Sequence, residues 1–99
     1  MNHKLVKSSN FIRESGKLAR KYPNFPIELN DTLHLLEENV FDTRLKTHKL
    51  KGDLNDFWAC SINYNLRIIF QFVQAIDKDS GKTVESIMLA AVGTHEDVY

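Results

Sequence analysis

Residues 66–73 form the most strongly β-prone stretch of this chain of 99 residues. The segment reads Leu-Arg-Ile-Ile-Phe-Gln-Phe-Val, so it is apolar at nearly every position and rich in β-branched and aromatic side chains. A strand with one solvent-facing side alternates apolar and polar residues, whereas a strand covered on both faces does not. The sequence therefore predicts a central strand here, buried on both sides of a sheet.

Two further stretches predict neighbouring strands. Residues 57–62 place three side chains on one face by alternation: Trp58, Cys60 and Ile62. Residues 84–92 form a final strand, which we expect Gly93 to end because glycine permits an unusual backbone at a corner. Clusters of turn-forming residues separate the strands at 63–65 and 77–82. The second half of the chain thus predicts consecutive antiparallel strands.

Residues 8–40 predict two helices. The first can be capped by a serine or asparagine side chain, and its apolar face consists of Phe11, Leu18, Ala19 and Tyr22. Pro23 ends this helix because proline disfavours helical geometry in the residue before it. Pro26 suits the first turn of the second helix. The apolar stripe of that helix repeats at helical spacing: Leu29, Leu33, Leu36 and Val40.

The short β-compatible segment 4–7 precedes the helices, so the order of elements is β-α-α-β-β-β. Grouping of helices with helices and strands with strands indicates an α+β fold. We expect an N-terminal helical hairpin packed on a mostly antiparallel twisted sheet. Residues 1–99 contain no repeat, low-complexity run or Pro/Gly-rich linker, so a single domain is expected.

Composition excludes several classes of protein. A hydrophobic content of 42% is adequate for a globular fold. No stretch approaches the roughly 18 consecutive apolar residues of a membrane span, and the N-terminus lacks the apolar run of a signal peptide. The single cysteine, Cys60, can form neither an internal disulfide nor a cysteine-based zinc site. We therefore expect a cytoplasmic protein.

The charges lie in blocks, although 13 basic and 13 acidic residues give a net charge of zero. Residues 1–26 carry six basic side chains and one acidic side chain, residues 27–42 five acidic and no basic, and residues 43–52 four basic and no acidic. Neutrality is unusual for an enzyme of nucleic acids, because phosphate binding is mostly electrostatic. The blocks indicate a dipolar molecule, although oppositely charged solvated faces explain them equally well.

Three short stretches carry more specific information: Leu45–Leu54 followed by Phe57-Trp58, then Asn63–Phe70, then Gly93–Tyr99. In this order and at these separations they resemble the RelE/ParE superfamily of type II toxin–antitoxin systems, and most closely its RelE and YafQ-like branches. The resemblance covers essentially the whole chain, because a preceding helix pair is also that family's layout. It implies the RelE-like microbial RNase fold.

The resemblance also implies an activity. Toxins of these branches are endoribonucleases that cut messenger RNA in the A site of the ribosome, inhibit translation and are neutralised by a cognate antitoxin. A ribose 2′-OH attacks the adjacent phosphate, which leaves a 2′,3′-cyclic phosphate and a 5′-OH end. The reaction needs a base, an acid for the leaving 5′-oxygen and positive groups around the phosphate. It needs no metal or cofactor.

Four residues match catalytic positions of that family. His95 matches the C-terminal catalytic histidine of YafQ-like toxins, and its expected role is proton donor to the leaving 5′-oxygen. His48 occupies the place of another functional histidine, and an imidazole exchanges protons near neutral pH. Arg67 corresponds to an arginine that contacts the reacting phosphate; an ion pair with an acidic residue is its structural alternative. Tyr99 matches a terminal aromatic that aligns the substrate nucleotide.

Lys49 and Lys51 are expected to neutralise phosphate, and Asn65 is expected to position the substrate. This chain departs from the pattern at two positions. YafQ-like toxins often have a histidine where Ser61 stands and an acidic residue where Asn65 stands. Neither a hydroxyl nor an amide can replace those groups as a base, so His48 is the candidate general base.

Two other functions stay open at this point. ParE-like members of the superfamily inhibit DNA gyrase and do not cut RNA, and the departures at Ser61 and Asn65 also fit a weakly active toxin remnant. The combination of His48, Arg67, His95 and Tyr99 favours the nuclease. The expected partners are messenger RNA on the ribosome and an antitoxin. The antitoxin should offer an acidic or amphipathic segment that lies across the helices and sheet.

Overall fold

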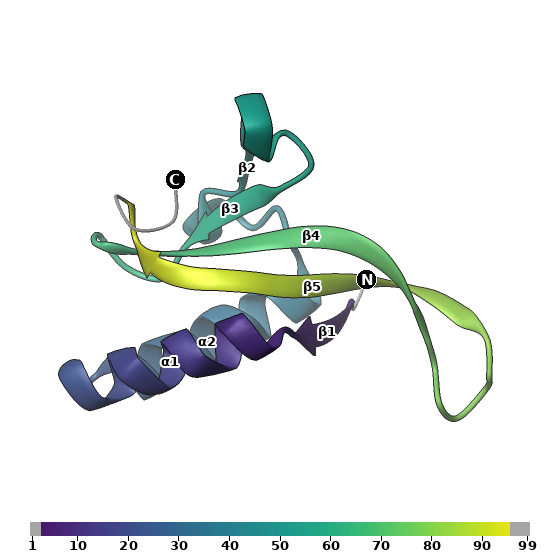
Figure 1. Ribbon diagram of the computed structural model, residues 1–99, viewed down its shortest axis with the longest axis horizontal. Coiled ribbons are helices and arrows are strands. Elements are labelled where there is room, and N and C mark those ends of the chain that lie inside the picture. Colours follow the sequence, from purple (N-terminus) through teal and green to yellow (C-terminus); the bar gives the residue numbers. More distant parts are fainter. Residues whose placement is uncertain (1–2, 96–99) are drawn as a thin grey trace.

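Within the described residues, 3–95, five strands form one mixed sheet with two helices packed on one of its faces (Figure 1). In this computed structural model the elements are β1 (Lys4–Lys7), α1 (Ser9–Lys21), α2 (Phe25–Glu38), β2 (His48–Lys49), β3 (Trp58–Ser61), β4 (Leu66–Ile76) and β5 (Thr83–Thr94). Two short 3-10 helices, η1 (Thr43–Leu45) and η2 (Gly52–Leu54), flank β2. The predicted α+β fold, with a helical hairpin on a mostly antiparallel sheet, is confirmed.

The sheet has the order β1-β5-β4-β3-β2. β1 runs parallel to β5, and the other neighbours are antiparallel. Sequence patterns did not predict β2, because two residues are too few for a visible alternation. The prediction that Gly93 ends the last strand is wrong: β5 continues through Thr94, and Gly93 pairs with Arg67 as an ordinary strand residue.

Both helices begin as predicted, and α1 ends as predicted. α2 ends at Glu38, so Val40 of its predicted apolar stripe lies beyond the helix, although it is buried in the core. The Ser8 hydroxyl caps α1 by accepting the Phe11 N–H at 3.0 Å, and Tyr22 is the last capping residue before Pro23. Pro26 lies in the first turn of α2. No helix of the described part of the chain is long and apolar enough to cross a membrane.

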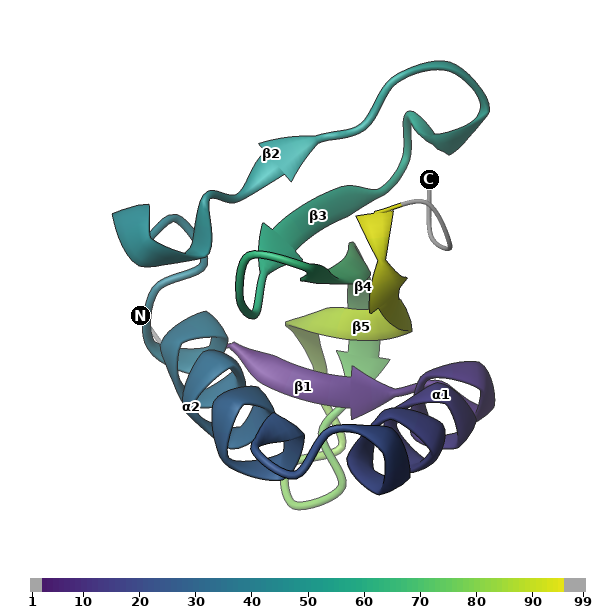
Figure 2. The same ribbon diagram turned by 90° about the vertical axis from the view of Figure 1, so that its left-hand side faces the viewer.

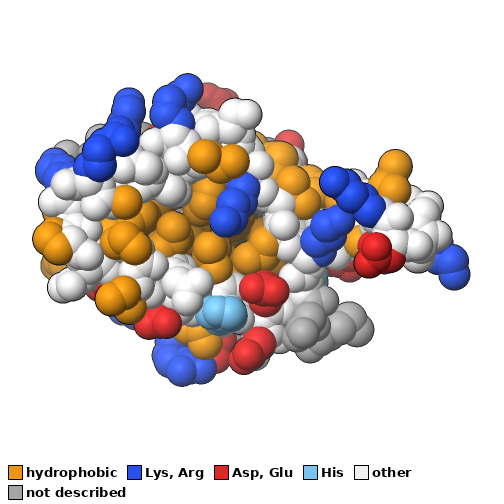
Figure 3. Space-filling view, turned by 90° about the horizontal axis from the view of Figure 1, so that it is seen from below, with side chains coloured by type: hydrophobic (Ala, Val, Ile, Leu, Met, Phe, Trp, Pro, Cys, Tyr) orange, Lys and Arg blue, Asp and Glu red, His pale blue; other side chains and the backbone are white. Residues whose placement is uncertain are grey.

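The larger core lies between the helices and the sheet (Figure 2). Phe11 of α1, Phe25 and Leu36 of α2, and Ile68 and Phe70 of β4 are all at most 1% exposed. The outer side of the helix layer keeps a band of hydrophobic side chains along its middle (Figure 3). A groove of about 350 Å³ between the two helices forms part of this surface.

A smaller core covers the opposite face of the sheet. Leu50, Ala59 and Ile69 are buried there, with Leu54 and Phe57 from the loop around η2 packed over them. The consecutive residues Ile68, Ile69 and Phe70 are therefore buried on alternate faces. This confirms the prediction from residues 66–73 that the strand is covered on both sides.

A β-bulge in β5 interrupts the pairing with β4. Ile69 pairs with Ala91 but Phe70 pairs with Leu89, so Ala90 is the additional residue. Polar side chains of α1 bind the backbone there: Asn10 Nδ2 donates to the Ala90 carbonyl at 3.1 Å, and Glu14 Oε1 accepts the Val92 N–H at 3.1 Å. These contacts satisfy backbone groups that the bulge removes from the ladder.

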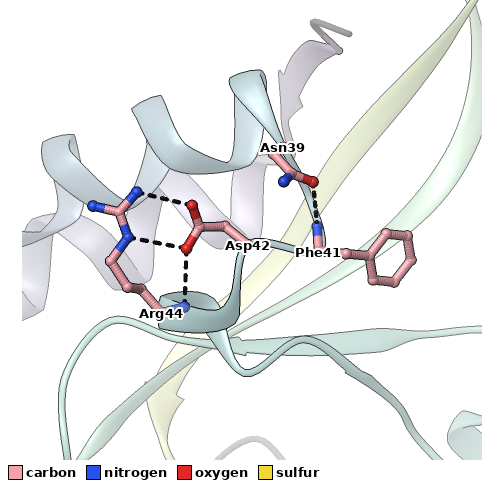
Figure 4. Close-up of polar contacts among 4 residues, drawn as sticks. All are labelled: Asn39, Phe41, Asp42 and Arg44. Atoms are coloured by element: carbon pink, nitrogen blue, oxygen red, sulfur yellow. Dashed lines mark hydrogen bonds and ion pairs between the residues drawn. The ribbon is translucent and has the colours of Figure 1, made fainter.

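Local polar contacts hold the segment between α2 and β2 (Figure 4). Asp42 accepts the backbone N–H of Arg44 at 2.9 Å and forms an ion pair with its guanidinium at 2.8 Å. The side-chain hydrogen bond from Arg44 lowers the pKa of Asp42 to about 2. Asn39 Oδ1 accepts the N–H of Phe41 at 3.1 Å. These turns lead into β2 and so set the position of His48.

We expect Asp42→Asn to destabilise the protein at neutral pH, because the amide can still accept the backbone N–H but loses the ion pair. Folding lowers the pKa of Asp42 from 3.8 to about 2. The ion pair therefore adds its full stabilisation of the folded state above pH 3.8, and this stabilisation disappears as the pH falls from 3.8 to about 2. Urea unfolding from pH 7 to pH 2 should show the two proteins converging in acid. Asp31→Asn, at an exposed position of α2, is the control. If the difference in unfolding free energy between the unmodified protein and Asp42→Asn stayed the same at every pH, the ion pair would not be its cause.

Candidate functional site

An open groove of about 530 Å³ lies where the β4–β5 hairpin meets the β3–β4 turn. Its described lining combines a cation, an imidazole, two phenol rings and two small polar side chains: Arg67, His95, Tyr22, Tyr64, Asn65 and Thr94. Three of the predicted site residues, Asn65, Arg67 and His95, therefore line one surface.

The strand register explains why these distant residues meet. Leu66 pairs with Thr94 and Arg67 pairs with Gly93, so His95 follows directly beyond the paired end of β5. On the other side of β4, Arg67 pairs with Ser61 of β3. Both lateral neighbours of Arg67 are small, which leaves room on this row of the sheet for a long guanidinium side chain.

Arg67 is half-buried and held against the turn. Its Nη1 donates to the carbonyl oxygens of Asn63 at 2.6 Å and Leu66 at 3.0 Å. No carboxylate among residues 3–95 forms an ion pair with Arg67. A structural ion pair, the alternative explanation for this arginine, is therefore not seen in the described part of the chain. A guanidinium has five N–H donors in a rigid fork, and those not used by the two carbonyls can bind an anion.

Asn63 organises the turn that carries this arginine. Its Oδ1 accepts the backbone N–H groups of Asn65 and Leu66, both at 2.9 Å. Its Nδ2 donates to Glu28 Oε1 of α2 at 3.1 Å. The turn at 63–65 was predicted, but this role of Asn63 was not. An asparagine at the start of a turn that binds backbone two residues ahead is the signal that indicates it.

His48 lies on the same face of the sheet as Arg67, two strands away. It pairs with Ala59, and Ala59 pairs with Ile69, which shares a face with Arg67 two residues along β4. Two strand spacings amount to roughly 10 Å. A ligand that contacts both His48 and Arg67 therefore has to lie on this face of the sheet, between the two side chains.

The tautomer of His48 follows from its contact with the Lys46 carbonyl. Nδ1 lies 3.0 Å from this oxygen, which can only accept, so Nδ1 carries the proton. The neutral imidazole then has its lone pair on Nε2, the form that a general base requires. Ser61 is engaged differently, because its hydroxyl donates to the Asn63 carbonyl at 2.8 Å within the turn.

Two further predicted site residues, Lys49 and Lys51, lie elsewhere. Lys49 pairs with Trp58, which packs on the helix-facing core, so the register places Lys49 on the opposite face from His48. Lys51 is exposed at the start of η2. Neither is among the described residues that line the groove. Tyr99 lies outside the described residues. The functions of all three stay predictions.

Sequence reasoning missed the two tyrosines of the groove. Tyr22 was predicted on the apolar face of the first helix. It is instead the capping residue at the end of α1, where it is 37% exposed and its ring lies 5.4 Å from Lys21 Nζ. Tyr64 is 92% exposed at the tip of the β3–β4 turn. An exposed aromatic side chain beside a cation suits stacking of unpaired bases. A tyrosine between two turn-forming asparagines was the available signal.

Other reactive groups lie away from this surface. Cys60 is fully buried between the helices and the sheet, and burial raises the pKa of its thiol to about 12. It is therefore the inert packed thiol that its alternation with apolar residues indicated. Among residues 3–95, no three His, Cys, Asp or Glu side chains gather in a way that could hold a metal ion.

Taken together, the groove can bind a phosphodiester through Arg67, exchange a proton through His95 and stack a base on Tyr22 or Tyr64. The α+β fold of this chain has counterparts among solved toxins. A YoeB/ParE toxin from Agrobacterium tumefaciens has a TM-score of 0.72 and 17% identity, over 93% of this chain and 98% of that chain.

Two more solved structures extend the comparison. A chain of the E. coli DinJ–YafQ toxin–antitoxin complex has a TM-score of 0.70 and 18% identity, over 100% of this chain and 99% of that chain. A metal-bound toxin from Helicobacter pylori has a TM-score of 0.70 and 23% identity, over 100% of both chains. No protein-family model and no curated protein matches the sequence. The chain has the RelE/YafQ-like toxin fold, and at these identities the likeness concerns the fold alone.

We expect Asn63→Ala to lower the free energy of unfolding by about 1–2 kcal/mol, because two backbone N–H groups and Glu28 lose their partner. Asn65→Ala is the matched control, since this exposed side chain should change stability by less than about 0.5 kcal/mol. Urea unfolding of both variants measures the difference. Equal stabilities would show that the turn does not depend on Asn63.

Proposed function

We propose that this chain is the toxin of a type II toxin–antitoxin system and that it cleaves messenger RNA in the A site of the ribosome. The observation that carries the proposal is the meeting of Arg67 and His95 in one groove, within a toxin fold. A cation and an imidazole beside one phosphate supply charge stabilisation and proton transfer, the two requirements of metal-independent RNA cleavage.

In the proposed reaction the substrate 2′-oxygen loses its proton and attacks the adjacent phosphorus, and the bond from phosphorus to the 5′-oxygen breaks. Arg67 stabilises the additional negative charge on the phosphate oxygens. Protonated His95 donates its proton to the leaving 5′-oxygen. The products are a 2′,3′-cyclic phosphate and a free 5′-OH, with no cofactor consumed.

His48 is the proposed general base, through the Nε2 lone pair that its contact with the Lys46 carbonyl implies. Because His48 lies two strands from β4, this role requires the side chains of His48 and Arg67 to reach toward one phosphate bound between them. Asn65 is proposed to position the nucleotide, and Lys49 and Lys51 to attract the phosphate backbone. Tyr99 is proposed to align the substrate base.

The proposed partner is a cognate antitoxin, and the proposed location is the cytoplasm, where the ribosome is found. DinJ–YafQ, one of the structures with this fold, is a toxin–antitoxin complex. The hydrophobic band on the helix layer offers an apolar surface for a partner segment, and the first 26 residues carry six basic side chains and one acidic side chain. An acidic amphipathic segment complements both features.

His95→Ala should reduce the rate of message cleavage on ribosomes by about 10²–10⁴-fold, the usual contribution of a general acid. The measurement is the mapping of RNA ends in a translation assay, with cuts expected inside A-site codons. His34→Ala is the control, because His34 is exposed on α2 away from the groove. Intact message together with inhibited DNA supercoiling would contradict the nuclease and favour a ParE-like gyrase inhibitor.

The helix groove should take part in antitoxin binding. Ala19→Glu places a charge in its lining and should weaken capture of the antitoxin encoded beside the toxin gene by about tenfold or more, because a buried unpaired charge is costly. Ile76→Glu is the control, at an exposed position at the far end of β4. If both variants bind the antitoxin as the unmodified protein does, the groove is not its binding surface.

A further inference from the structure

We propose that a second, smaller cavity beside the groove binds one nucleobase of the substrate, and that Glu28 makes this cavity prefer guanine. The inference deepens the proposed function and rests on it for the nature of the substrate. It assigns a role to the acidic second helix, whose negative block is otherwise unexpected in a protein that binds RNA.

The cavity lies at the junction of α1 and α2 and has a volume of about 190 Å³. Tyr22, Asn24, Glu28, Asn63 and Asn65 contribute its polar and aromatic lining. Tyr22 and Asn65 also line the groove that contains Arg67 and His95. The two cavities are therefore neighbours. A nucleotide whose phosphate is bound by Arg67 would have its base next to the smaller cavity.

The lining of the small cavity suits a base and not a phosphate. It combines one phenol ring, three amides and one carboxylate, and none of its described residues is a cation. A carboxylate repels phosphate but accepts hydrogen bonds from the N–H groups of a base edge. Tyr22 can stack on the face of the base while the amides and Glu28 bind its edge.

Glu28 is held in place for this contact. Its Oε1 accepts from Asn63 Nδ2 at 3.1 Å, and a carboxylate has about four acceptor positions, so most of its capacity is available to a ligand. Guanine presents two adjacent donors, N1–H and N2–H₂, on one edge. Adenine and cytosine each present a single amino group there, and uracil a single N–H. Guanine is thus the base that can fill both carboxylate oxygens.

The same asparagine connects the two cavities. The side chain of Asn63 binds Glu28, and its backbone carbonyl accepts from Arg67 Nη1 at 2.6 Å. The proposed base contact and the proposed phosphate contact are therefore both fixed to one residue of the β3–β4 turn. A nucleotide bound to both would have its base and its phosphate held at a set separation.

The test is an NMR titration of the free toxin with guanosine 3′-monophosphate and with inosine 3′-monophosphate, which lacks only the N2 amino group. The unmodified protein should bind the guanosine nucleotide about tenfold more tightly, the value of one hydrogen bond to a charged group. Shifts should include the side-chain amides of Asn24, Asn63 and Asn65. In Glu28→Gln the ratio of the two Kd values should fall to about one.

Glu37→Gln is the matched control, because Glu37 lies on the same helix and lines a different cavity. It should keep the tenfold ratio. Equal Kd values in the unmodified protein, a ratio that survives in Glu28→Gln, or no saturable binding at millimolar nucleotide would each overturn the proposal. Because binding is measured without cleavage, a protein that selects guanosine but leaves message intact would contradict only the proposed nuclease. Cleavage without guanosine selection would contradict only the base cavity.

Discussion

The bulge at Ala90 determines which side chains can meet at the end of the central hairpin. Ile87 and Leu89 face the helix core before the bulge and Val92 faces it afterwards, so the additional residue shifts the alternation of β5 by one. Gly93 is thereby brought onto the same face as its partner Arg67. A one-residue slip would reverse every side chain beyond this point. Asn10 and Glu14 of α1 hold the bulge, so the helix layer stabilises the geometry of a site on the far side of the sheet.

The β3–β4 turn is the second fixed element of the site. Asn63 satisfies two backbone N–H groups of its own turn, contacts α2 through Glu28 and accepts from Arg67 through its carbonyl. Turn, helix and strand are therefore joined at a single residue. This arrangement keeps Arg67 beside β5 although the groove around it is open.

Much of the fold was predictable because its cause is local. Proline positions and helical spacing give α1 and α2, and a segment without polar alternation gives β4. The bulge was not predictable, because Ala90 has no distinctive side chain and the reason for its position lies in α1. For the site, resemblance to a family indicated Arg67, His95 and His48, and the register brings the first two together. Tyr64 lies between two turn-forming asparagines, a weak signal of exposure, whereas nothing local marks Glu28, and only its position in three dimensions reveals it.

The central claim is that Arg67 and His95 act on one phosphate, and a double-mutant cycle tests it most directly. Cleavage rates on ribosomes would be compared for Arg67→Ala, His95→Ala and the double variant. Residues that stabilise the same transition state are strongly non-additive, so the double variant should lose little more activity than the more damaging single variant. Losses that multiply as two independent effects would show that the two side chains belong to separate sites, and would contradict the account.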